Sequence, residues 1–172
     1  MTGAKEQVSG PCGGLVTTIV RTRKAPEIRN DLVGIAGVHY VAFELSRRGM
    51  IALPTTRNTK GYDIIVVSSD GTRHANIQVK AAQKCPSFWP MQHFEKIRKE
   101  PNDWYVLVRG ILKGAVECFL VSGQEARAQV KRVEEEDSKE GRAPFPCIYV
   151  GTKRAEAGAK ERWKSAWEAW KL

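Results

Sequence analysis

The sequence predicts an α/β protein whose mixed sheet of four to five strands is flanked by helices. Residues 61–80 read GYDIIVVSSDGTRHANIQVK, where two apolar, β-branched runs flank Asp70-Gly71, a typical signal of a tight β-hairpin. Before and after the strand patterns, apolar residues recur at helical spacing instead. With no internal repeat or second boundary, the chain divides into an N-terminal extension, residues 1–28, and a single domain, residues 29–172.

The domain opens with a predicted helix. Asn30 or Asp31 is placed to cap its first turn, and Gly49 is placed to end it. Between them, five apolar residues recur at helical spacing and should face the sheet: Leu32, Ile35, Val38, Ala42 and Leu45. The first strand is expected at 50–53, and a polar connection leads from it to the hairpin.

The predicted turn also sets the register of the hairpin. A two-residue turn places Asp63 directly opposite Gln78, and opposed residues point to the same face with Cβ atoms about 5 Å apart. Lys80, two residues beyond Gln78, shares that face. The other face should belong to the core, and it carries Ile64, Val66, Ile77 and Val79.

A carboxylate, an amide and an ammonium group therefore gather at one end of the hairpin. Such a set suggests a divalent-metal site for phosphodiester chemistry. The plainer alternative is a strand-end ion pair between Asp63 and Lys80, with Gln78 exposed. The polar connection that precedes the hairpin should lie beside this site, and three of its residues are placed to bind phosphates: Arg57, Asn58 and Lys60.

Two more strands and a helix follow the hairpin. The apolar runs 104–111 and 116–121 predict the strands. Ser122 is placed to cap a helix that runs to about residue 133, and Glu125 occupies the capping-box position.

The remaining segments predict packing elements rather than a second site. The acidic run 134–137 is interpreted as a solvated helix end, and 144–150 as a short edge strand. Phe88 and Trp89 are expected to plug the edge of the core rather than to stack on a base. A C-terminal helical stripe should pack on the sheet, with dimerisation as the second choice, and consists of Ala159, Trp163, Ala166, Trp167 and Trp170.

Composition favours a soluble protein with a polyanionic partner. The chain has 172 residues, 28 Lys and Arg against 19 Asp and Glu, and a net charge of +9. This excess of positive charge favours nucleic acid, with DNA as the expected partner. No apolar run approaches the roughly 20 residues of a membrane span, so we expect a cytoplasmic protein without a membrane role. The four cysteines form no close ligand pair of the kind that structural zinc sites use.

Three segments together resemble the PD-(D/E)XK nuclease superfamily, whose members include type II restriction enzymes and Holliday-junction resolvases. The segments are GVHYVAFELSRRGMIAL, GYDIIVV and NIQVKA, and the resemblance covers roughly residues 31–122. Leu45 and Gly49 fit the end of the family's first helix, Asp63 fits its metal-binding aspartate, and Gln78-Val79-Lys80 fits a Q-x-K variant of its last motif.

The resemblance implies a restriction-endonuclease-like core with elements in the order α-β-β-β-α-β. It also implies catalytic roles for Asp63, Gln78 and Lys80. Mg²⁺ or Mn²⁺ would be bound by Asp63, Gln78 and the carbonyl group of Val79. A homodimer would suit an enzyme that cuts both strands of DNA.

One position departs from the family pattern. Many members carry a glutamate in the first helix where this chain has Val38, and Glu44 lies almost two turns further on and should point elsewhere. The predicted function is a metal-dependent DNA endonuclease. The alternatives are a non-catalytic nucleic-acid-binding or assembly module that keeps the nuclease fold, and a basic scaffold protein.

Overall fold

The computed structural model describes residues 28–56, 61–83, 86–111 and 115–172. Almost all of the predicted N-terminal extension lies outside these ranges. The helices are α1 (Asn30–Arg47), α2 (Gly123–Lys139) and α3 (Ala159–Ala169). The strands are β1 (Ile51–Pro54), β2 (Ile64–Val67), β3 (His74–Ala82), β4 (Phe88–Pro90), β5 (Asp103–Arg109), β6 (Glu117–Ser122) and β7 (Cys147–Tyr149).

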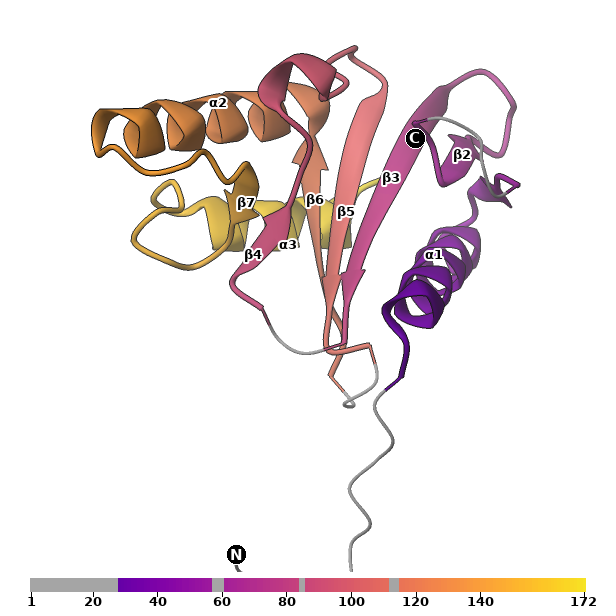
Figure 1. The fold of residues 1–172 in the computed structure, drawn as a ribbon. Helices are drawn as coiled ribbons and strands as arrows, with labels where there is room; N and C mark the ends of the chain where they lie inside the picture. The colour runs from indigo at the N-terminus through magenta and orange to yellow at the C-terminus, as the bar shows by residue number, and fades with distance from the viewer. Residues whose placement is uncertain (1–27, 57–60, 84–85, 112–114) are drawn as a thin grey trace, which may run out of the picture.

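The predicted α/β class is confirmed, with a mixed five-stranded sheet at its centre. The strand order is β1-β2-β3-β5-β6, and β4 pairs with β7 in a separate two-stranded sheet. The run β1-β2-β3 is antiparallel, β3 and β5 are parallel, and β5 and β6 are antiparallel. Helix α1 lies on one side of the sheet, whereas α2 and the small sheet lie on the other (Figure 1).

The order of elements differs from the α-β-β-β-α-β order that the resemblance implied. Strands β5 and β6 both precede α2. In the described part of the crossover from β3 to β5 there is no α-helix, only β4 and a 3₁₀ turn, Phe94–Lys96. Pro86 and Pro90 disfavour a helix in the first half of this crossover, because proline lacks the N–H group that a helix interior needs.

The stripe that helix α1 buries matches the predicted one only in part. Ala42 and Leu45 are buried as predicted, and Val38 is partly buried. Leu32 is 49% exposed and Ile35 is 36% exposed, so their assignment to the core is wrong. The buried residues of the helix are Val33, Gly37, Val41, Ala42 and Leu45. Glycine at position 37 selects this face, because a Cβ atom there would lie 2.4 Å from the Cβ atom of Ala81 on β3.

The two ends of α1 differ in how well they were predicted. The N-cap residue is Arg29 rather than Asn30 or Asp31, and within the described residues its side chain makes no capping hydrogen bond. At the other end Gly49 has a φ of 85°, and the N–H of Met50 donates to the carbonyl of Leu45. This is the left-handed ending that a glycine permits, so the prediction of Gly49 is confirmed.

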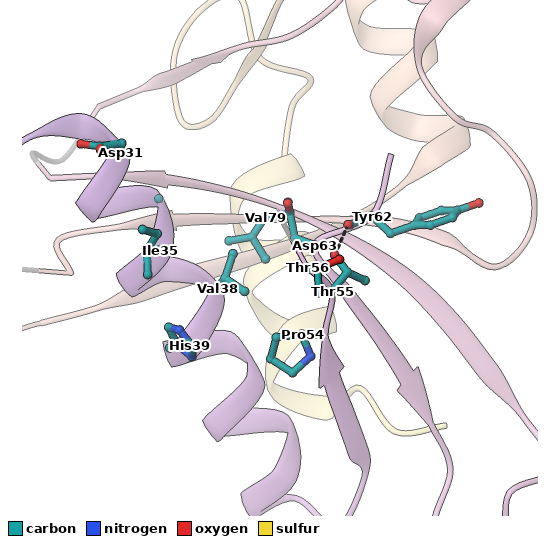
Figure 2. Close-up of a pocket in the computed structure, with 11 residues that line it drawn as sticks. Asp31, Ile35, Val38, His39, Pro54, Thr55, Thr56, Tyr62, Asp63 and Val79 are labelled. Carbon is teal, nitrogen blue, oxygen red and sulfur yellow. Dashed lines mark hydrogen bonds between the residues drawn. The ribbon is translucent and has the colours of Figure 1, made fainter. Parts of the chain in front are cut away.

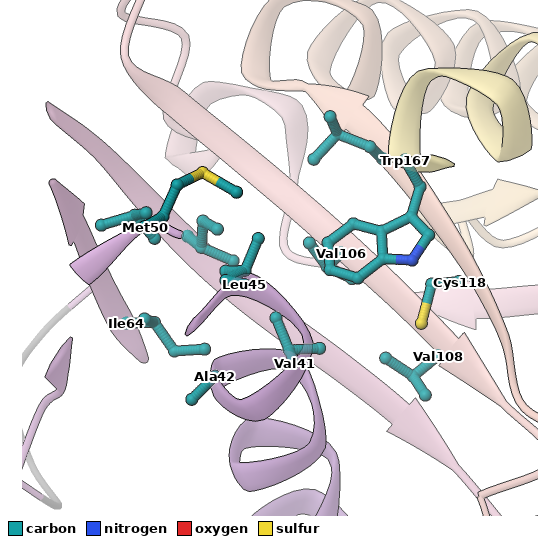
Figure 3. Close-up of a cluster of buried hydrophobic side chains, with 12 residues drawn as sticks. Val41, Ala42, Leu45, Met50, Ile64, Val106, Val108, Cys118 and Trp167 are labelled. Atoms are coloured by element: carbon teal, nitrogen blue, oxygen red, sulfur yellow. The ribbon is translucent and has the colours of Figure 1, made fainter. Parts of the chain in front are cut away.

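Two hydrophobic clusters hold the sheet between its helices. The first lies between α1 and the sheet and includes Leu45, Ile64 and Val106, with Trp167 of α3 at its margin (Figure 3). The second lies on the opposite face and includes Trp163 and Trp89. Burial of Trp163, Trp167 and Trp89 confirms that the C-terminal stripe packs on the sheet and that Trp89 closes the core edge, while Phe88 stays 40% exposed.

Helix α2 confirms its predicted start and corrects its predicted end. The Ser122 hydroxyl accepts a hydrogen bond from the Glu125 N–H, and the Glu125 carboxylate accepts one from the Ser122 N–H, so the capping box is present. The helix then continues through the acidic run. Asp137 is only 2% exposed and pairs with Arg142 at 2.8 Å and Arg154 at 2.7 Å, so a solvated end is wrong for this residue.

Candidate functional site

The candidate site lies where β2 separates from β3. Strand β2 begins with Ile64, opposite Ile77, whereas β3 continues to Ala82. Beyond Ile77, the edge of β3 that faces β2 therefore has no pairing strand in the described chain. Asp63 occupies this opening. Its N–H donates to the Ile77 carbonyl at 2.8 Å, and its carboxylate Oδ2 accepts a hydrogen bond from the Val79 N–H at 2.7 Å.

The predicted hairpin register that leads to this arrangement is confirmed. Ile64 pairs with Ile77, and Val66 pairs with Ala75, as the two-residue turn required. Ile64, Val66 and Ile77 are fully buried, as expected for the core face.

The turn itself is longer than predicted. The N–H of Ser68 donates to the carbonyl of Arg73 at 2.9 Å, which closes a loop over residues 69–72. The Asp70 carboxylate accepts hydrogen bonds from the Ser68 hydroxyl and from the N–H and hydroxyl of Thr72, and these bonds lower the pKa of Asp70 to about 2. The longer turn is centred between Asp70 and Gly71, as the predicted two-residue turn is. The pairing of β2 with β3 is therefore the same.

Asp63 and Lys80 are electrostatic neighbours. Val79 and Ala81 face α1, so alternation along β3 turns Lys80 and Gln78 to the other face. Lys80 is partly buried, and this burial lowers its pKa because it disfavours the charged ammonium. The negative charge of Asp63 acts in the opposite direction and favours the protonated form. A lysine with a lowered pKa beside a carboxylate is a frequent feature of catalytic sites.

Gln78 lies in a different environment. It lines a small space together with Tyr62, Arg98 and Tyr105, on the face of β3 away from α1. Among the described residues, no hydrogen bond joins the Gln78 amide to Asp63. The structure therefore brings Asp63 to Val79 and Lys80, and it places Gln78 next to Tyr62 instead.

A cavity of about 530 Å³ opens between α1 and the start of β2. The walls include Gly34, Ile35, Val38 and His39 from the helix, and Pro54, Thr55, Asp63 and Val79 from the strand side. Figure 2 shows Val38 projecting from α1 toward Val79, with Asp63 beyond them. Val38 and Asp63 thus line one cavity, and the helix position at which the family resemblance expects a glutamate belongs to the same site as the aspartate.

Glu44 does not line this cavity. Its carboxylate lies 3.0 Å from the Arg47 guanidinium and 3.6 Å from that of Arg48, as its position on the helix predicted.

No protein-family model, curated protein or solved structure matches the chain. The candidate site therefore rests on its own geometry and on the motif resemblance.

Three residues that the sequence patterns did not single out surround the approach to Asp63. The Arg98 guanidinium lies over the Tyr62 ring, 3.9 Å from its centroid, and donates a hydrogen bond to the Tyr62 hydroxyl. Gly61 has a φ of 97°, and a Cβ atom there would lie 2.4 Å from the Arg98 side chain. Arg98 thus holds the segment that leads into Asp63. The only local sequence signal of this arrangement is the glycine and tyrosine directly before Asp63.

Three residues assigned to phosphate binding fall in a part of the chain that the structure does not describe. Arg57, Asn58 and Lys60 lie outside the described residues. In the ranges that are described, no three His, Cys, Asp or Glu side chains are grouped as a metal site would require. Also within those ranges, none of the helices has the length and apolar character needed to cross a membrane.

Proposed function

We propose that the chain is a metal-dependent DNA endonuclease of the PD-(D/E)XK type, which hydrolyses phosphodiester bonds. The observation that carries this proposal is the position of Asp63. Its carboxylate is held by the Val79 N–H at the opening between β2 and β3, and its charge acts on the partly buried Lys80.

The oxygen donors at this opening suit a hard divalent cation. Asp63 would hold Mg²⁺ or Mn²⁺ through its carboxylate, with the Val79 carbonyl as a neutral oxygen donor. The Gln78 amide would have to turn out of the space beside Tyr62 to become a further neutral donor. The bound ion would stabilise the charge that develops on the phosphate. With Asp63 as the only anion in this set, the ion should bind weakly until phosphate oxygens of the substrate complete its shell.

Lys80 has the most direct chemical role in this proposal. A lysine whose pKa is lowered carries a larger fraction of neutral amine near physiological pH, and a neutral amine can accept a proton from the attacking water. In its protonated form the same group would stabilise the negative phosphate. Both roles require Lys80 to stay beside Asp63, where the β3 register holds it.

The net charge of +9 supports a nucleic-acid partner. If about five phosphates are neutralised on binding, the logarithm of the affinity for duplex DNA should fall with log salt at a slope of about −4.5. A flat salt response would instead favour the basic scaffold.

A second function is favoured by one specific observation. The cavity wall next to Asp63 carries the apolar side chain of Val38, so the site has one carboxylate fewer than the family resemblance implies. A non-catalytic nucleic-acid-binding or assembly module with the nuclease fold would have this composition.

Nicking of supercoiled plasmid separates the two functions. Wild type, Asp63→Asn and Lys80→Ala should be compared with Mg²⁺, with Mn²⁺ and with EDTA. The endonuclease proposal expects metal-dependent nicking by wild type that both variants lose, with DNA binding retained by Lys80→Ala. Equal nicking by all three proteins would reveal a contaminating nuclease. Binding without nicking by any of them would support the non-catalytic module.

A further inference from the structure

Gly34 lies in the interior of α1, where glycine is disfavoured, and the packing of the protein gives no reason for it. Glycine is the least favourable residue in a helix interior apart from proline. Apart from its chain neighbours and the nearby backbone of α1, a Cβ atom at position 34 would have no atom of the described structure within 4 Å. Gly37, one turn later, differs because its Cβ atom would collide with Ala81. Gly34 does, however, line the cavity beside Asp63.

The cavity has the size and composition of a ligand site. Its volume of about 530 Å³ falls in the range of small-molecule pockets, about 300–1,000 Å³. Ile35, Val38 and Val79 give it apolar walls, while Asp63 and the His39 ring provide polar groups. A side chain at position 34 would project into this space, so glycine keeps it open.

We propose that this cavity receives one unpaired nucleobase of a nucleic-acid strand whose phosphate lies at Asp63 and Lys80. This inference rests on the proposed function, which places the phosphate, and adds the kind of substrate that the site accepts. A nucleobase is flat and apolar on its faces and polar at its edges, which matches a cavity with apolar walls and polar groups on both its helix side and its strand side (Figure 2). The net charge of +9 favours binding of the negatively charged nucleic-acid strand to which the base belongs.

The alternatives fit the cavity less well. A metal ion alone would leave the apolar walls without a role. A paired base cannot enter, because it is stacked inside the duplex and must be unpaired and unstacked first. The expected substrate is therefore DNA with an unpaired nucleotide near the cleaved bond.

Binding to two matched DNA duplexes tests this inference. Each carries a single-nucleotide bulge, with adenine in one and an abasic residue in the other, and affinities are measured by fluorescence anisotropy in EDTA. Because contact with the apolar walls would remove the base from water, wild type should bind the adenine bulge about tenfold more tightly. Gly34→Leu should bind both duplexes equally, since its side chain would project into the cavity and take up space that the base needs.

Two controls keep the test independent of folding. Circular dichroism and thermal unfolding should show that Gly34→Leu is folded. Leu32→Ala changes an exposed residue of the same helix that does not line the cavity, and it should retain the preference for the adenine bulge. Equal binding of both bulges by wild type would overturn the inference, and so would a folded Gly34→Leu variant that keeps the preference.

A parallel nicking assay on the same two bulged duplexes, with Mg²⁺ or Mn²⁺, separates failure of this inference from failure of the proposed function. Binding in EDTA requires no catalysis. A base preference without metal-dependent nicking would support the cavity and contradict the endonuclease. Nicking by wild type without a base preference would support the endonuclease and contradict the cavity.

Discussion

The carboxylate of Asp63 accepts a hydrogen bond from the backbone N–H of Val79 at 2.7 Å, at the point where β3 continues without β2 beside it. A partly buried N–H group at such an edge needs an acceptor that a neighbouring strand would otherwise supply. Asp63 provides it with one carboxylate oxygen. The same bond fixes the carboxylate beside Lys80, so a single contact completes the edge of the sheet and positions the candidate site.

Lys80 should make the stability of the protein depend on pH. Burial lowers its pKa in the folded state, so between the lowered value and its ordinary value the unfolded chain binds more protons. Stability contributed by this group therefore rises with pH across that window. Lys80→Met should raise the urea midpoint near neutral pH and remove part of this rise. If the variant and wild type have the same slope of stability against pH just below the ordinary lysine pKa, the assignment is contradicted.

Two glycines of α1 should respond oppositely to alanine. At position 37 the new Cβ atom lies 2.4 Å from the Cβ atom of Ala81, and such overpacking costs about 1–3 kcal/mol. At position 34 nothing in the described structure beyond the chain neighbours and the nearby backbone of α1 lies within 4 Å, so alanine should gain up to about 1 kcal/mol of helix propensity. In urea unfolding, the free energy of unfolding should be higher than wild type for Gly34→Ala and lower than wild type for Gly37→Ala. The reverse order would show that α1 does not approach β3 as described.

The parts of the fold that the sequence predicts well depend on local signals. The register of the hairpin follows from alternation on both sides of a turn, and it survives although the turn is longer than expected. The capping box of α2 needs only Ser122 and Glu125. The pairing of β2 with β3 also brings Asp63 near Lys80. The sequence therefore predicts that part of the site.

Tertiary contacts decide the rest. Helix α1 carries two overlapping apolar stripes, and the fit of Gly37 against Ala81 selects the one that is buried. No local sequence pattern predicts that Arg98 lies over the ring of Tyr62, because the two residues are far apart along the chain. Arg98 and Tyr62 both line the small space beside Gln78, and Tyr62 also lines the larger cavity at Asp63.

Asp137 should stabilise the protein most clearly above acidic pH. Burial by itself would raise its pKa, but the hydrogen bonds from Arg142 and Arg154 outweigh this and lower it. A carboxyl group with a lowered pKa contributes stability that is present above its unfolded pKa and lost as pH falls through the folded value. Asp137→Asn should therefore lower the urea midpoint at neutral pH, with a gap to wild type that narrows below about pH 4.

A matched variant tests whether the pairing of Asp137 is the cause. Glu135→Gln removes a carboxylate from the same acidic run, but its partner Lys131 and Glu135 itself are both more than half exposed. Exposed pairs of this kind contribute little, so the control should leave the midpoint nearly unchanged. Equal effects of the two variants would indicate general charge repulsion in the run rather than a buried pair.

Val38→Glu should increase metal-dependent nicking. The cavity already contains Asp31, which pairs with Arg29, and the substitution adds a carboxylate on the helix wall that faces Asp63. A further hard, charged ligand there should strengthen Mg²⁺ binding. We expect wild type to be slow and to work better with Mn²⁺ than with Mg²⁺, because Mn²⁺ binds a given site of N and O ligands more tightly than Mg²⁺. In the variant, the rate with Mg²⁺ should rise about tenfold, which corresponds to ~1.4 kcal/mol of transition-state stabilisation.

Two controls separate the added charge from other effects. In Val38→Gln, the new side chain has nearly the shape of glutamate but no charge. Any loss of packing against the first hydrophobic cluster should therefore affect Val38→Gln and Val38→Glu equally. Phe43→Glu adds a carboxylate to an exposed position of the same helix, away from the cavity. Only Val38→Glu should lower the Mg²⁺ concentration needed for half-maximal nicking of supercoiled plasmid. If all three variants nick at the wild-type rate, position 38 does not contact the metal, and the non-catalytic module becomes the better description of the site.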